Sequence, residues 1–199
     1  MPIPMLLFLA AAQATPLQPP PAPTRHWGRF FISPMGEPFR AERGGDALEM
    51  WFQQADRNHD GYLTLEEMQQ DAERFFATLD VNHDGEIDPD EISRYETVVA
   101  PEIANGRETE ADLAQGHRGA ARFGLLDLPE PVASADADFN RGVSLTEFRQ
   151  AAAKRFAAID LDHRGRLTLA ALELIRPAAE PQEHKSDTTD APTDVDPQP

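Results

Sequence analysis

The chain has 199 residues, enough for one or two compact domains. Its formal net charge of -17 argues against a nucleic-acid partner, because phosphate binding requires a basic face, and it fits cation binding instead. Because cysteine is absent, a disulfide framework, a zinc–thiolate site and a thiol nucleophile are all excluded.

Residues 1–14 are predicted to form a secretory signal peptide. They contain no charged residue, and an apolar run from Met5 to Ala12 ends in Ala12-Gln13-Ala14, a small-x-small cleavage site. The run is too short to span a bilayer, so we expect an exported protein, periplasmic or extracellular, without stable membrane insertion after cleavage. A disordered cytosolic leader is the alternative, because the usual basic residue before the run is missing.

Residues 15–24 are rich in proline, which predicts an extended, semi-rigid linker. Residues 25–45 combine apolar side chains with residues that forbid a long helix. The former are Phe30, Phe31, Ile32 and Phe39, and the latter are Pro34, Gly36 and Pro38. We expect a packed, irregular arm that covers apolar surface of the domain, with a partner-binding arm as the alternative.

Two twelve-residue loops with one pattern follow, at 56–67 and 80–91, and both have glycine at position 6. Oxygen donors recur at positions 1, 3, 5, 7, 9 and 12. Ca²⁺ requires this arrangement, because it takes six to eight oxygen ligands at about 2.3–2.6 Å and the chain must curl tightly around it. The predicted ligands are Asp56, Asn58, Asp60, Tyr62, Thr64 and Glu67 in the first loop, and Asp80, Asn82, Asp84, Glu86, Asp88 and Glu91 in the second. The second loop holds four carboxylates and the first three, so we expect the second to bind calcium most tightly.

Helices are predicted on both sides of the first loop. Residues 46–55 form the entering helix, which Asp46 can cap. Residues 65–79 carry a continuous apolar stripe without glycine or proline, and Thr64 and Glu67 have the spacing of a capping box. This helix leads straight into the second loop over about 22 Å. Loops at opposite ends of one helix cannot easily pair with each other, so we expect them to pair with loops elsewhere in the chain.

Two further loops begin at Asp136 and Asp160, each 80 residues after an earlier one. In the third loop Arg141 replaces the glycine and must accept a left-handed backbone, which costs on the order of 1–3 kcal/mol. We therefore expect a weaker calcium site there. The fourth loop has Arg164 at position 5 and Ala171 at position 12, so it is predicted not to bind calcium and to act as a structural partner. The predicted ligands of the third loop are Asp136, Asp138, Asn140, the Gly142 carbonyl, Ser144 and Glu147.

The remaining segments are expected to connect and close the domain. Residues 101–122 are predicted to form a polar connector with a helical turn near 108–115, and residues 125–135 a short entering helix. A second shared helix is predicted at 145–159 and a closing helix at 169–176. Residues 177–199 are polar, acidic and proline-containing, so they are predicted to be disordered.

From these loops the chain resembles the EF-hand calcium-binding superfamily over residues 46–176, and it looks like a bacterial exported member. The resemblance implies an all-α fold with two EF-hand pairs, each helix-loop-helix-loop-helix, in halves 46–100 and 124–176 of one domain. It also implies Ca²⁺ as ligand and a role as a buffer or calcium-stabilised binding protein. The alternative is a sensor that exposes an apolar groove for a protein partner. Sensors favour Met-rich grooves, whereas only Met50 and Met68 fall in this region.

No catalytic residue is predicted, and we do not expect an enzyme. Three of the six histidines, His59, His83 and His163, occupy position 4 of a loop. That position faces solvent and does not coordinate the ion, so the repeat itself accounts for their regular spacing. The other histidines lie in predicted loops without a nearby nucleophile signature.

Overall fold

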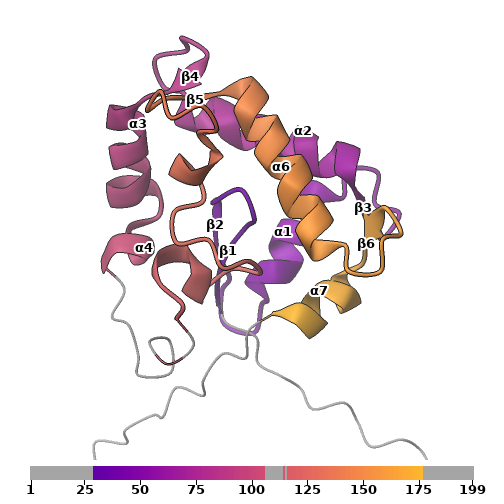
Figure 1. The fold of residues 1–199 in the computed structure, drawn as a ribbon. Coiled ribbons are helices and arrows are strands. Elements are labelled where there is room, and N and C mark those ends of the chain that lie inside the picture. The colour runs from indigo at the N-terminus through magenta and orange to yellow at the C-terminus, as the bar shows by residue number, and fades with distance from the viewer. Residues whose placement is uncertain (1–28, 106–113, 115, 177–199) are drawn as a thin grey trace, which may run out of the picture.

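The computed structural model describes residues 29–105, 114 and 116–176, and these form a mostly helical fold around a small β-hairpin (Figure 1). The predicted signal peptide, linker and C-terminal tail lie outside the described residues, as does nearly all of the helical turn predicted at 108–115. Among the described residues, no helix has both the length and the apolar character needed to cross a membrane.

The arm before the first helix is a β-hairpin, so the prediction of an irregular arm is wrong. Strands β1 (Phe30–Ile32) and β2 (Pro38–Arg40) pair antiparallel, with Phe31 opposite Phe39. The prolines and glycine that forbid a helix are compatible with the turn, where Gly36 has φ 99° and donates to the Ser33 carbonyl at 2.9 Å. The arm does cover apolar surface as predicted, because Phe31 and Ile32 are fully buried.

The first half begins with α1 (Ala47–Ala55), which Asp46 caps by accepting from the Leu48 amide at 2.7 Å. Helix α2 (Leu65–Leu79) has the predicted limits and carries the predicted capping box. After the second loop come α3 (Pro89–Arg94), a π-helical turn η1 (Tyr95–Val99) and α4 (Pro101–Asn105). The local signals of caps and apolar periodicity were therefore sufficient to place α1 and α2.

The second half has less regular structure before its first loop. The entering helix predicted at 125–135 is wrong, because this segment holds only the 3-10 turn η3 (Ala133–Ala135). Proline disfavours helical geometry in the residue before it, and Pro129 and Pro131 stand close together here. The Pro129 carbonyl instead accepts from the Ala120 amide at 2.9 Å. The other elements are η2 (Gly119–Arg122), α6 (Leu145–Ile159) and α7 (Leu169–Ile175).

The four loops pair between the halves, which confirms that loops sharing a helix do not pair with each other. Strand β3 (Leu63–Thr64) of the first loop pairs with β6 (Arg166–Leu167) of the fourth. Strand β4 (Glu86–Ile87) of the second loop pairs with β5 (Val143–Ser144) of the third. Helices α2 and α6 lie side by side and connect the two loop pairs at opposite ends of the molecule (Figure 1).

Two apolar clusters stand behind the two loop pairs. One contains Ile87, Val143 and Phe148, and the other contains Trp51, Leu63 and Leu167. Each cluster draws residues from both halves, and each fully buried large side chain contributes about 1.5–3 kcal/mol to stability. The position-8 residues of the loops are thus anchored in the core, and the carboxylates at positions 1 and 12 of the first two loops are also buried.

Candidate metal centres

All four loops share one backbone conformation. Position 6 is left-handed in each, with φ 82° at Gly61, 91° at Gly85 and 70° at Gly165. A Cβ at any of these glycines would meet nothing within 4 Å, so glycine is required there for its φ and not for space. Arg141 in the third loop has φ 81°, which confirms the left-handed backbone predicted for it.

The aspartate at position 1 organises each loop by binding the backbone across from it. One carboxylate oxygen of Asp56 accepts from the Gly61 amide at 2.9 Å, and that of Asp80 from the Gly85 amide at 3.1 Å. Asp136 binds the Arg141 amide at 3.0 Å in the same way. The second oxygen is unpaired in Asp80. In Asp56 it accepts from the Asp60 amide at 3.2 Å, and in Asp136 from the Phe139 amide at 2.7 Å.

Positions 3 and 5 lie against each other within each candidate site. The Asn58 amide group donates to Asp60 at 3.1 Å, and the Asn82 amide group donates to Asp84 at 3.0 Å. In the third loop the order is reversed, since Asn140 donates to Asp138 at 3.3 Å. The position-3 and position-5 side chains, both predicted ligands, are therefore in contact with each other in each candidate site.

The glutamate at position 12 is the third residue of the exiting helix and reaches back to the loop. Glu67 accepts from the Thr64 amide at 3.0 Å through Oε2. Glu91 accepts from the Asp88 amide at 3.1 Å through Oε2 and from the Val81 amide at 2.6 Å through Oε1. This glutamate therefore joins the two ends of the second loop.

Glu147 makes the corresponding contacts in the third loop. It accepts from the Ser144 amide at 2.9 Å and from the Ala137 amide at 3.0 Å. The bonds from the Ser144 backbone and hydroxyl hold the pKa of the Glu147 carboxyl below its usual value. The carboxylate is thus kept ionised, which is the form that binds a cation.

The donor geometry fits a hard cation best in the third loop. Carboxylate oxygens of Asp136, Asp138 and Glu147 lie within 4.8 Å of one another, the only such group of three found among the described residues. The sequence favoured the second loop by carboxylate count, yet convergence of the carboxylates is closest where Arg141 strains the backbone. An all-oxygen donor set of this kind suits Ca²⁺.

The first two loops each hold one buried carboxylate oxygen without a hydrogen-bond partner. These atoms are Oε1 of Glu67 and Oδ1 of Asp80, and no other buried side-chain nitrogen or oxygen in the described part of the chain lacks a partner. A buried unpaired polar atom costs about 1–3 kcal/mol. Both oxygens belong to predicted ligands, at positions 12 and 1, so a bound cation would remove this cost. The residues of these loops therefore fit Ca²⁺.

The fourth loop keeps the backbone of the others but not their ligands. Asp160 accepts from the Gly165 amide at 2.8 Å, as the other position-1 aspartates do. Arg164 forms an ion pair with Asp162 at 3.0 Å, so a protein cation stands beside the carboxylate at position 3. Position 12 is Ala171, whose amide is bound by the Thr168 hydroxyl at 3.2 Å.

A family model described as EF hand matches residues 48–70 and 72–94, which contain the first and second loops. Residues 48–94 belong to the EF-hand superfamily. The matches confirm a mostly helical fold built from adjacent EF-hand units and indicate calcium binding by this EF-hand protein. No curated protein matches the sequence. The third and fourth loops lie beyond the matched residues, and their relation to the first two rests on the repeat in the sequence and on their shared backbone geometry.

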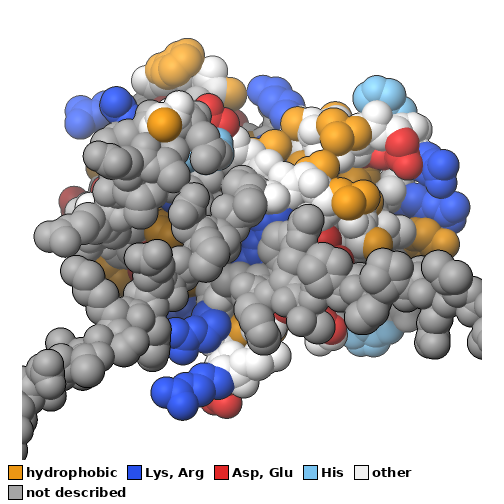
Figure 2. Space-filling model, turned by 90° about the horizontal axis from the view of Figure 1, so that it is seen from below, with side chains coloured by type: hydrophobic (Ala, Val, Ile, Leu, Met, Phe, Trp, Pro, Cys, Tyr) orange, Lys and Arg blue, Asp and Glu red, His pale blue; other side chains and the backbone are white. Residues whose placement is uncertain are grey.

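The histidines at position 4 are exposed, as that position requires. His59, His83 and His163 have φ between 52° and 59°, and all three are exposed. The group of metal-ligating residues found in the described part of the chain contains no histidine. Figure 2 shows histidine side chains at separate places on the surface.

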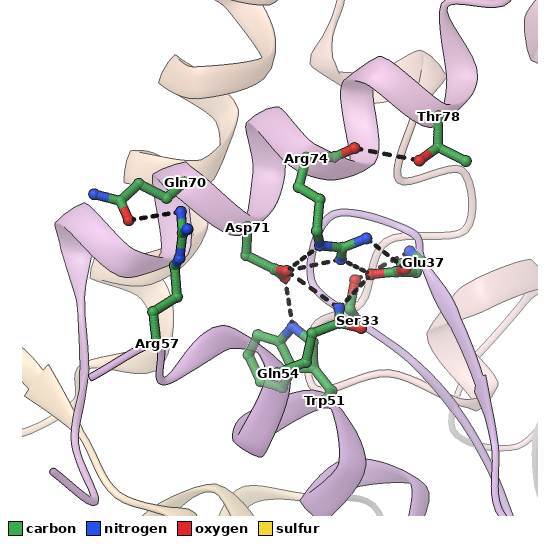
Figure 3. A network of polar contacts seen from close by, with 9 residues as sticks. All are labelled: Ser33, Glu37, Trp51, Gln54, Arg57, Gln70, Asp71, Arg74 and Thr78. Carbon is green, nitrogen blue, oxygen red and sulfur yellow. Dashed lines mark hydrogen bonds and ion pairs between the residues drawn. The ribbon is translucent and has the colours of Figure 1, made fainter. Parts of the chain in front are cut away.

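A buried polar network beside the first loop was not predicted from the sequence. Asp71, only 6% exposed, accepts from the Trp51 indole at 3.0 Å, from Gln54 at 3.2 Å and from Arg74 at 2.7 Å (Figure 3). Arg74 also binds Glu37 in the hairpin turn. The network joins the two helices that flank the first loop to each other and to the hairpin turn. A carboxylate inside the apolar stripe of residues 65–79 was the available signal.

Proposed function

We propose that this protein is a calcium buffer or calcium-stabilised binding protein that takes up three Ca²⁺ ions, one in each of the first three loops. The main observation that supports this proposal is that unpaired carboxylate oxygens of Glu67 and Asp80 are buried inside two of these loops. In the third, three carboxylates converge. Each arrangement is unfavourable without a cation and becomes favourable with one.

The burial of the aromatic stripe favours a buffer over a sensor. Phe75, Phe76 and Phe148 are at most 4% exposed, and they pack between α2, α6 and the elements around them. A sensor exposes an apolar groove when calcium binds. Here such an opening would separate core residues that both halves share.

Native mass spectrometry of the full chain at increasing calcium tests the stoichiometry. We expect three bound ions in the wild type and two in Glu147→Gln, because that glutamate is a ligand of the third loop only. Four ions would contradict the exclusion of the fourth loop. Two ions in the wild type, unchanged in Glu147→Gln, would show that Arg141 disables the third.

A hydrophobic dye separates the two roles. If the stripe is core in both states, the dye should bind the calcium-free form at least as well as the calcium form. A large rise in dye fluorescence on adding calcium would favour the sensor instead.

A further inference from the structure

The register of the two ladders brings position 7 of one loop opposite position 9 of its partner. Arg166 of the fourth loop is the Cα partner of Thr64 in the first, and Glu86 of the second loop is the Cα partner of Ser144 in the third. Thr64 and Ser144 are predicted ligands. An EF-hand loop uses only the backbone carbonyl at position 7, so the side chain there is free to act on the partner loop.

Glu86 places a carboxylate against the third loop. A Cβ built on Gly142 would lie 3.0 Å from Glu86 Oε2 and 3.5 Å from Asn140 Oδ1. The Glu86 carboxylate therefore lies beside Gly142 and on the same side of it as Asn140, the position-5 residue, where an amide stands in place of a carboxylate. Gly142 is itself position 7 of the third loop, and it has no side chain with which to return this contact to the second loop.

Arg166 places a positive charge against the first loop. Its guanidinium carbon lies 4.2 Å from the centroid of the Tyr62 ring, a cation–π contact that holds the side chain over this loop. Tyr62 is position 7 of the first loop. A positive charge is therefore fixed beside a predicted calcium site, and its source is the loop that has lost its own ligands.

We propose that the position-7 side chains of the second and fourth loops tune the calcium affinity of the loops paired with them. Glu86 strengthens the third site and offsets its missing carboxylate, whereas Arg166 weakens the first site. The inference rests on the proposed calcium binding of these loops. Neither side chain has to touch the ion, because a unit charge acts on a divalent cation across several ångströms.

Both side chains are exposed, so water and salt reduce the effect. Coulomb interaction in a high dielectric corresponds to roughly a two- to fivefold change in the dissociation constant at low ionic strength. Screening sets in over about 8 Å at 0.15 M salt, so the change should shrink as salt is added. The first and third loops each have three ligand carboxylates. The two charges therefore act in favour of the third site relative to the first, and they oppose the effect of the strain at Arg141.

Calorimetric titration of single-site variants of the full chain tests the proposal. Glu67→Gln with Glu91→Gln leaves the third site, and in that background Glu86→Gln should raise the dissociation constant two- to fivefold. Glu91→Gln with Glu147→Gln leaves the first site, and there Arg166→Gln should lower it by the same factor. Circular dichroism checks folding, since the ladder bonds are made by the backbone.

Two controls change the same charge at exposed residues outside the ladders, Glu49→Gln and Arg43→Gln. Each should change the dissociation constant by less than the corresponding ladder variant, and both ladder effects should fade as potassium chloride is raised. If the single-site backgrounds bind calcium but the ladder variants match their controls, or shift with the opposite sign, the cross-loop proposal is overturned. If the double variants that keep a single site bind no calcium, the proposed function is wrong, and the cross-loop proposal, which depends on it, is wrong as well.

Discussion

The same substitution at position 12 should have different effects on the calcium-free protein in the first two loops. Replacing glutamate with glutamine leaves one acceptor oxygen and turns the other into an amide NH2 group that can only donate. The outcome therefore depends on whether both carboxylate oxygens are in use. They are in Glu91, which binds three backbone amides, but not in Glu67.

Glu91→Gln should lower the free energy of unfolding by about 1.5–3 kcal/mol without calcium. Oε1 accepts from the Val81 and Asn82 amides at 2.6 and 3.2 Å, and Oε2 accepts from the Asp88 amide at 3.1 Å. Whichever way the glutamine turns, its amide NH2 group faces a backbone N–H, so at least one charge-assisted bond is lost. Glu91 is only 7% exposed, which limits replacement of that bond by water.

Both variants lose one negative charge at a helix N-terminus. Beyond that shared loss, Glu67→Gln should change the free energy of unfolding of the calcium-free protein by less than about 0.5 kcal/mol. Both contacts from Thr64, its amide at 3.0 Å and its hydroxyl at 2.7 Å, use Oε2. The glutamine oxygen can keep them, and the amide NH2 group takes the place of the unpaired Oε1. The shared loss is the negative charge at a helix N-terminus, about 0.3–1 kcal/mol, and it cancels when the two variants are compared.

Urea denaturation in the presence of a calcium chelator measures this difference. We expect Glu91→Gln to be less stable than Glu67→Gln by at least about 1 kcal/mol, and Glu147→Gln, whose two oxygens are both bonded, to lie nearer to Glu91→Gln. Adding calcium then tests binding separately, because one site at a hundredfold excess over its dissociation constant contributes about 2.7 kcal/mol. The rise in melting temperature on adding calcium should fall most in Glu91→Gln. Equal stabilities without calcium would refute the hydrogen-bond argument, and an equal fall would refute the ranking of sites by carboxylate count.

Two further predictions concern the segment before the third loop. Arg155, 6% exposed, donates to the Pro34 and Pro131 carbonyls at 2.9 and 2.7 Å. Arg155→Met should therefore lower the free energy of unfolding by about 2–4 kcal/mol, whereas Lys154→Met, at an exposed position, should change it little. Equal losses of stability in urea denaturation would contradict this prediction. Burial, with the Glu96 carboxylate as a second cause, raises the pKa of Glu130 from 4.5 to about 7. Because the folded state holds this proton more tightly, the stability it contributes at acidic pH is lost as pH rises through about 7. Glu130→Gln should accordingly be more stable than the wild type at pH 8 and show a flatter dependence of melting temperature on pH between 5 and 8; curves that run parallel would contradict the assignment.

Features set by local sequence could be predicted, because their causes lie within a few residues. Asp46 and Thr64 cap the helices that follow them, as their positions indicated. The left-handed backbone at Arg141 followed from its place in the loop pattern. The pairing of loops across the halves is not a local feature. It could still be predicted, because one unbroken helix separates the first loop from the second.

Features set by tertiary contacts could not be predicted in the same way. The prolines around Met35 excluded a helix, but only the apolar surface beneath them decides that the arm becomes a hairpin. The proximity of Glu86 to Gly142 depends on the register between two distant strands. The ligand assignments stay predictions, although the unpaired oxygens of Glu67 and Asp80 give them a physical basis that the sequence alone lacked.

The retention of a fourth loop without a ligand set has a structural explanation. Each shared helix carries a loop at both ends, so the first loop can form a ladder only with a loop from the other half. The fourth loop supplies that strand, and its Leu167 is buried opposite Leu63 in the core. Without calcium ligands the fourth loop binds no ion. Without its loop conformation, the first loop would have no strand to pair with and the core behind it would be exposed. The structure of the loop therefore requires Gly165 for its turn and Leu167 for its packing. It makes no such requirement at the ligand positions occupied by Arg164 and Ala171.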